Sequence, residues 1–130
     1  MVAASTILQS NARFAKEQHS GAVCVFAGAT AGIGMATLKK LAQLLQSSTF
    51  YIIARSPSRH VGLLNQIREI GPSNVYIFIE AQVSLISDID AACHKVTPSE
   101  SKVDYLFMSP GGFPWQGAVC IALSSPKPIE

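Results

Sequence analysis

A glycine-rich turn between an apolar run and a helical pattern constrains this chain more than any other feature. The stretch from Val23 to Leu38 reads VCVFAGATAGIGMATL. This order predicts a β-strand that feeds a tight turn and then a helix, whose first backbone N–H groups face a phosphate. We expect Gly28 to end the strand, Gly32 to let the backbone approach a pyrophosphate, and Gly34 to let the helix pack closely on the sheet. A turn that simply reverses the chain direction is the alternative.

Apolar runs and helical patterns alternate along the rest of the chain. Strands are predicted at 22–27, 50–54, 75–79 and 103–108, and helices at 4–18, 33–45, 61–70 and 86–95. The strands are apolar on both faces, as buried parallel strands are. Right-handed crossovers then predict an α/β fold of Rossmann type, a doubly wound parallel sheet in the order 3-2-1-4. We expect an N-terminal helix in residues 1–20, a dinucleotide-binding half-domain in residues 21–116 and an irregular tail in residues 117–130.

Composition argues against several classes of partner. The net charge of +2 is too small to indicate nucleic acid, and no run approaches the ~18 apolar residues of a membrane span. The three cysteines are odd in number and lack paired spacing, which argues against a disulfide framework and a zinc site. The histidines, His19, His60 and His94, have no partners at catalytic spacing and are expected at the surface. The N-terminus also lacks a signal-peptide pattern, so we expect a cytoplasmic protein.

The glycine turn resembles the cofactor loop of short-chain dehydrogenases/reductases, T-G-x-x-x-G-I-G. Here the loop runs from Ala27 to Gly34, with only the leading threonine replaced. The resemblance extends over roughly residues 23–112, and Asn11-Ala12-Arg13 in the first helix is similar to a fungal branch of the family. The resemblance implies a nicotinamide-dinucleotide site that includes Gly28, Thr30, Ala31, Gly32, Ile33 and Gly34.

The end of the second strand predicts which dinucleotide fits. A site for NAD places an acidic residue there, whereas this chain has Arg55 and Ser56, with Arg59 nearby. A guanidinium binds a 2′-phosphate through two charge-assisted hydrogen bonds, and a carboxylate would repel it. The sequence therefore favours NADP as the cofactor. An Arg55 that is an ordinary solvent-exposed residue is the alternative.

The match to the family is incomplete at two further positions. Where the family has an aspartate that meets the adenine amino group, this chain has Gln82 followed by Val83, and the glutamine carbonyl still accepts that hydrogen bond. The family's N-N-A-G becomes Met108 to Gly111, so Ser109 and Gly111 are expected to approach the cofactor through their backbone. A plain turn after a strand is the alternative for this second segment.

The family's catalytic motif has no counterpart in the sequence. The family uses a tyrosine with a lysine four residues later, but no such lysine follows Tyr51, Tyr76 or Tyr105, which are expected to pack in the sheet. We therefore assign no catalytic residue and no metal. We expect a truncated NADP(H)-binding half of an oxidoreductase, inactive alone, whose intact relatives act on small carbonyl or alcohol substrates.

Two other functions stay open. One is a non-enzymatic interaction module that self-associates or pairs with another protein through the edge of strand 103–108. The other is a doubly wound domain whose glycine turn binds a different phosphate ligand.

Overall fold

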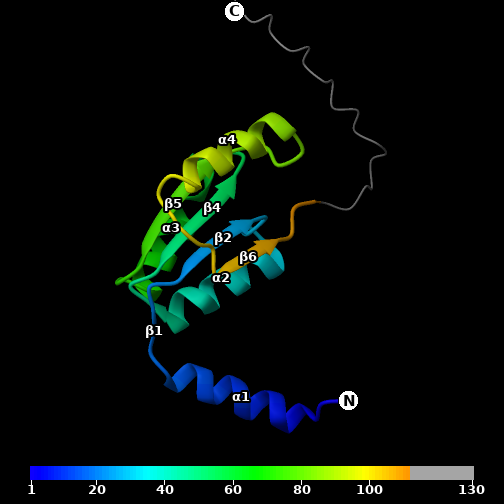
Figure 1. Cartoon of the computed structure of the whole chain (residues 1–130), viewed down its shortest axis with the longest axis vertical. Helices are drawn as coiled ribbons and strands as arrows, with labels where there is room; N and C mark the ends of the chain where they lie inside the picture. The colour runs from blue at the N-terminus through cyan, green and yellow to red at the C-terminus, as the bar shows by residue number, and fades with distance from the viewer. Residues whose placement is uncertain (112–130) are drawn as a thin grey trace, which may run out of the picture.

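The computed structural model describes residues 1–111 as a parallel sheet with helices on both faces (Figure 1). The helices are α1 (Ala4–Lys16), α2 (Gly32–Leu44), α3 (Val61–Ile70) and α4 (Ile86–Val96), with a short 3₁₀ helix, η1 (Pro57–His60). The strands are β1 (His19–Ser20), β2 (Val23–Ala27), β3 (Leu45–Gln46), β4 (Thr49–Ala54), β5 (Val75–Glu80) and β6 (Tyr105–Met108). The predicted tail at 117–130 and the predicted domain end at 116 lie outside the described residues.

The main sheet has the strand order β5-β4-β2-β6, and all of its pairs are parallel. This arrangement is the predicted doubly wound order, so the α/β fold of Rossmann type is confirmed. Each predicted strand and helix is present, with its ends shifted by no more than a few residues. Since all strands point the same way, their carboxyl ends meet at one edge of the sheet.

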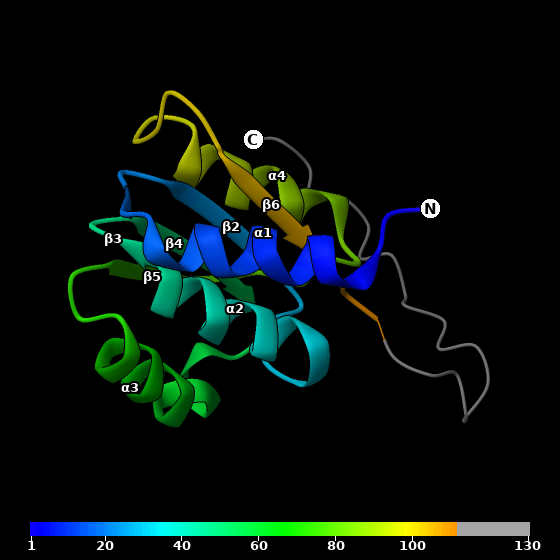
Figure 2. The ribbon, with the colours of Figure 1, turned by 90° about the horizontal axis from the view of Figure 1, so that it is seen from below.

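The larger core lies between the sheet and helices α2 and α3, which cover one face while α4 covers the other (Figure 2). Phe26 stacks on Phe50 and Phe107, with ring centroids 6.2 and 5.5 Å apart. Cys24 is fully buried beside them, and burial, followed by the charge of Asp104, raises the pKa of its thiol to about 12. The thiol therefore stays neutral and fills space in the core.

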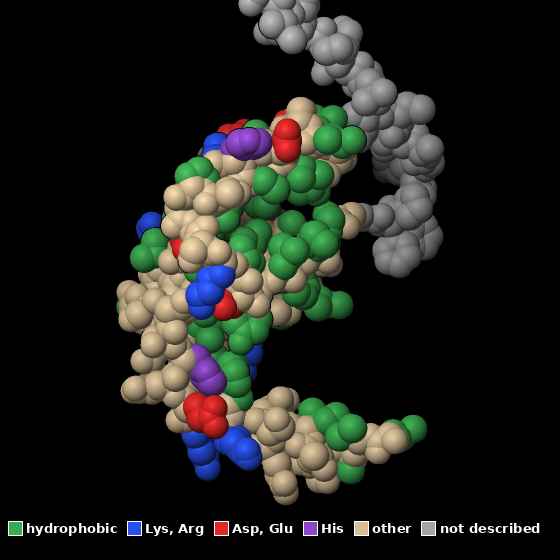
Figure 3. Space-filling view, in the orientation of Figure 1, with side chains coloured by type: hydrophobic (Ala, Val, Ile, Leu, Met, Phe, Trp, Pro, Cys, Tyr) green, Lys and Arg blue, Asp and Glu red, His purple; other side chains and the backbone are tan. Residues whose placement is uncertain are grey.

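The outer strands are less buried than the sequence predicts. We expected all four strands to be buried on both faces, but Val75 of β5 is 56% exposed, and Leu106 and Met108 of β6 are 61% and 69% exposed. Within the described residues β5 and β6 are the edges of the sheet, and α4 packs over a cluster that includes Tyr51 and Ile79. Figure 3 shows hydrophobic side chains gathered on the surface between α4 and β6.

The N-terminal helix α1 has no buried residue and stands apart from the sheet (Figure 1). It is attached through Phe14, whose ring stacks on His19 at 3.7 Å, and the His19 ring nitrogen Nε2 donates to the Phe14 carbonyl over 2.9 Å. Next to it, β1 pairs with β3 in a parallel ladder of its own. His19 is partly exposed, so it lies at the surface as expected, but its half-buried ring also anchors the helix. No helix among the described residues is long and apolar enough to cross a membrane.

Candidate nucleotide-binding site

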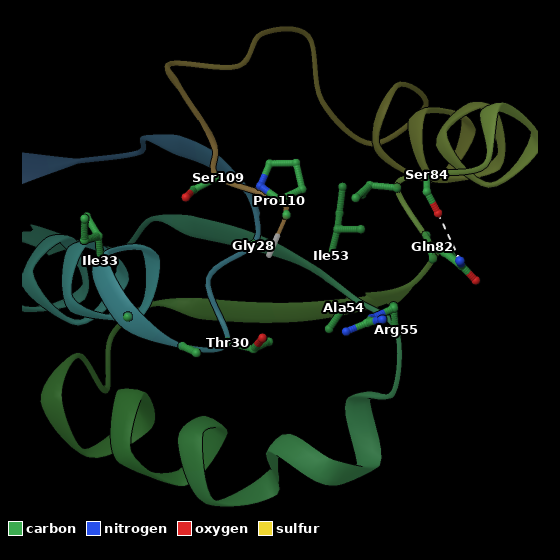
Figure 4. A pocket seen from close by; sticks show the side chains of 15 residues that line it. Gly28, Thr30, Ile33, Ile53, Ala54, Arg55, Gln82, Ser84, Ser109 and Pro110 are labelled. Atoms are coloured by element: carbon green, nitrogen blue, oxygen red, sulfur yellow. Dashed lines mark hydrogen bonds between the residues drawn. The ribbon is translucent and has the colours of Figure 1, made fainter. Parts of the chain in front are cut away.

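A cavity of about 700 Å³ lies at the carboxyl ends of β2, β4, β5 and β6 (Figure 4). Ligands of open α/β sheets bind at this edge. Each wall is the turn that follows one strand: residues 28–33 after β2 without Ala29, residues 53–55 at the end of β4, residues 81–84 after β5 and residues 109–111 after β6.

Most of the residues predicted from the sequence line this cavity. They are Gly28, Thr30, Ala31, Gly32, Ile33, Arg55, Gln82, Val83, Ser109 and Gly111. Gly34 and Ser56 do not line it. Five further lining residues were missed: Ile53, Ala54, Ala81, Ser84 and Pro110. Ile53 and Ala54 belong to a predicted strand, and Ala81, Ser84 and Pro110 lie next to predicted residues. Their position at a strand end was the only sequence signal that could have assigned them to the cavity.

The glycines of the turn have different surroundings. Gly28 has a φ of +86°, and a β-carbon there would overlap the backbone carbonyl of Ser109. Gly34 is buried, and a β-carbon there would overlap the carbonyl of Gly28, so α2 packs closely on the turn itself. Gly32 has a φ of +58° and open space around its missing side chain. Gly28 and Gly34 thus allow close packing within the protein, whereas Gly32 leaves the backbone open toward the cavity.

The amino end of α2 opens into the cavity. The residue before the helix, Ala31, has no side chain that can cap it, and the helix starts at Gly32. The first N–H groups of a helix have no partner within the helix, and they carry a partial positive charge. With Ala31, Gly32 and Ile33 all lining the cavity, this helix end is arranged to meet an anion.

Arg55 is the only charged side chain among the described residues that line the cavity. It follows the last residue of β4 and is exposed (Figure 4). Ser56 comes next but precedes η1, where its carbonyl accepts the backbone N–H of Arg59 over 3.0 Å. The lining residues therefore carry positive charge and no acidic group.

None of the three tyrosines lines the cavity. Tyr51 and Tyr76 pack against the core, as predicted, whereas Tyr105 on the edge strand β6 is 40% exposed, so the packing role predicted for it is wrong. Tyr51 is 3% exposed, and its hydroxyl donates to Glu100 over 2.9 Å. Burial, followed by the bond to Glu100, raises the Tyr51 pKa. The Tyr76 hydroxyl donates to the carbonyl of Gly71, and burial raises the Tyr76 pKa.

In residues 1–111 no cluster of His, Cys, Asp and Glu side chains is suited to hold a metal ion.

Known proteins resemble this chain in sequence and in fold. An oxidoreductase of Emericella nidulans is 39% identical over 112 residues, which cover 86% of this chain and 33% of that protein. L-Sorbose reductase from Gluconobacter frateurii, solved with NADPH and L-sorbose, has a TM-score of 0.63 at 23% identity, covering 73% of this chain and 35% of that one. NAD⁺-bound xylitol dehydrogenase has a TM-score of 0.63 at 22% identity, covering 74% and 35%. No protein-family model matches the sequence.

The fold and the turns at its strand ends define a Rossmann-type protein of the kind found in short-chain dehydrogenases/reductases, as the glycine turn predicted. In sequence the chain is similar to fungal oxidoreductases. It spans about a third of the length of the relatives that it matches.

Proposed function

We propose that this chain binds NADP(H) in the cavity at the strand ends and is the cofactor-binding part of a short-chain oxidoreductase. One observation carries the proposal: the glycine turn, the open end of α2 and Arg55 line a single cavity. The diphosphate lies against the backbone of Gly32 and Ile33, where the helix end favours negative charge.

Arg55 supports NADP over NAD. The fold itself does not choose, because one protein with this fold was solved with NADPH and another with NAD⁺. The choice depends on the residue after β4, and Arg55 offers a guanidinium for the 2′-phosphate. Ser56, which was also predicted to help, does not line the cavity, so Arg55 carries this assignment, and no lining carboxylate opposes the phosphate.

The remaining predicted residues contact the other parts of the dinucleotide. Gln82 and Val83 lie at the adenine, with the Gln82 carbonyl as the acceptor of the adenine amino group. Ser109 and Gly111 approach the cofactor through their backbone. The substrate of the whole oxidoreductase is a small carbonyl or alcohol compound. We assign no hydride-transfer residue to this chain, since its sequence holds no Tyr-x-x-x-Lys.

Titration with NADPH and NADH tests the proposal on three forms: the wild-type chain, Arg55→Ala, and a control, Arg68→Ala. Arg68 is an exposed arginine of α3 that does not line the cavity, so Arg68→Ala removes the same positive charge as Arg55→Ala without touching the site. Losing the guanidinium–phosphate bonds costs ~1.5–3 kcal/mol, or about 10- to 150-fold in NADPH affinity, and should leave NADH binding unchanged. Equal wild-type affinities for the two cofactors, or equal losses in both variants, would contradict the assignment of NADP.

An interaction module that pairs through β6 is the second candidate. Leu106 and Met108 are 61% and 69% exposed, and within the described residues β6 pairs only with β2. A chain that self-associates and binds neither cofactor would favour this function over the first.

A further inference from the structure

The turn after β5, residues 81–85, is held from outside the cavity by α4. The backbone N–H of Gln82 donates to Oδ2 of Asp88 over 2.8 Å. Asp88 belongs to the first turn of α4 and does not line the cavity, whereas Gln82 does. The carboxylate therefore supports the cavity wall from behind.

Three further hydrogen bonds fix the same turn. The backbone N–H of Ala81 donates to the carbonyl of Ala54 over 3.1 Å, and that of Leu85 donates to the carbonyl of Gln82 over 2.9 Å. The side-chain nitrogen of Gln82 donates to the Ser84 hydroxyl over 3.0 Å (Figure 4). With its nitrogen engaged, the Gln82 amide offers its oxygen as an acceptor.

Asp88 bonds to this turn although its own helix start has no side-chain cap. The residue before α4 is Leu85, whose side chain cannot cap the helix. The negative charge of Asp88 in the first turn interacts favourably with the helix dipole even without the bond to Gln82. The contact with Gln82 adds a link between the helix and the cavity wall. Loss of that link would leave the backbone N–H of Gln82 without this partner and so loosen the part of the turn that presents the Gln82 amide.

We infer that Asp88 is a positioning residue for the adenine end of the dinucleotide site: it holds the Gln82 backbone so that the Gln82 amide oxygen meets the adenine amino group. The inference rests on the proposed function, because it requires a nucleotide in the cavity. It gives Asp88 a role in base selectivity that is separate from its contribution to helix stability.

The experiment compares NADPH with its hypoxanthine analogue, in which a carbonyl replaces the adenine amino group. The wild-type chain should bind NADPH more tightly by about 2- to 12-fold, the range for one net hydrogen bond. Asp88→Ala should weaken NADPH binding and bring this ratio close to 1. Asp88→Asn, which keeps an acceptor oxygen, should retain the ratio. Asp90→Ala removes the same charge from an exposed position of the same helix and should change neither value.

The outcomes separate this inference from the proposal on which it rests. If Asp88→Ala weakens both ligands equally, or leaves both unchanged, Asp88 serves only the helix and the inference is wrong. If the wild-type chain binds neither ligand, the proposed function fails and the inference fails with it. If Asp88→Ala does not fold, Asp88→Ser is the second variant, because it keeps a polar residue in the first turn but shortens the acceptor. Asp88→Ser should show the same loss of selectivity. An unchanged ratio of the two affinities in Asp88→Ser would contradict the inference.

Discussion

At the scale of single residues, Gly28 and Gly62 allow a matched test of the turn. Gly28 has a φ of +86°, and a β-carbon there would overlap the Ser109 backbone, whereas a β-carbon at Gly62 in α3 meets nothing within 4 Å. Gly28→Ala should lower the free energy of unfolding by about 2–4 kcal/mol. Gly62→Ala should raise it by about 0.5–1 kcal/mol. Urea denaturation measures both, and similar small effects would show that the turn is not as close-packed as described.

Asp104 makes the stability of the folded chain depend on pH. Its Oδ2 accepts the backbone N–H of Val23 over 2.8 Å, and its Oδ1 accepts Lys102 Nζ over 2.9 Å. The bond to Val23, followed by that to Lys102, lowers the Asp104 pKa. Because the pKa of the folded state lies below that of the unfolded state, the charge contributes stability above about pH 4, and this contribution is lost as the pH falls through the folded pKa.

We therefore expect the difference in unfolding free energy between wild type and Asp104→Asn to be constant from about pH 5 to 7 and to shrink below about pH 4. Urea denaturation at several pH values measures this difference, which also cancels the titration of the other carboxylates. A difference that stays constant or grows on acidification would mean that the Asp104 pKa is not lowered in the folded chain.

At the scale of elements, the register of β6 decides which of its side chains face solvent. Phe107 pairs with Phe26, and the two rings stack with centroids 5.5 Å apart, so Phe107 belongs to the core beside α2. Leu106 pairs with Val25 on the opposite face and is 61% exposed. A lysine at Phe107 would disrupt the core and therefore could not test edge pairing cleanly.

Leu106→Lys is the better test of self-association. An added lysine on an edge strand disfavours pairing with another chain. If the wild-type chain associates at tens of micromolar, the variant should therefore have a lower sedimentation coefficient than the wild type at the same concentration. Gln66→Lys, at an exposed position of α3, is the matched control and should leave association unchanged. A wild-type chain that sediments as a monomer would contradict pairing through β6.

At the scale of the whole molecule, the sequence predicts the main sheet well because strong local patterns define its parts. Long apolar runs and helical periods place the elements, and the crossover rule then orders the strands as observed. The cavity follows from the same rule, because the turns after parallel strands must meet at one edge.

Features that depend on distant contacts were not predictable in this way. The strands β1 and β3 have two residues each, too few to show a period, and they form only because chain segments far apart meet. Asn74 is 9% exposed, and its side chain bonds to Ser48, Ala42 and Leu45, although nothing in its local sequence marks a buried polar residue. The exposure of Leu106 likewise depends on where the described sheet has its edge.

The central claim is that the cavity at the strand ends holds the dinucleotide. The most direct measurement is an NMR titration of the ¹⁵N-labelled chain with NADPH, which follows each backbone amide. We predict that the largest shifts fall on the cavity turns, at Gly32, Ile33, Arg55, Gln82 and Val83, and that amides of α1 and α3 stay unchanged. Shifts confined to other surfaces, or no shifts at millimolar NADPH in a folded chain, would contradict the account.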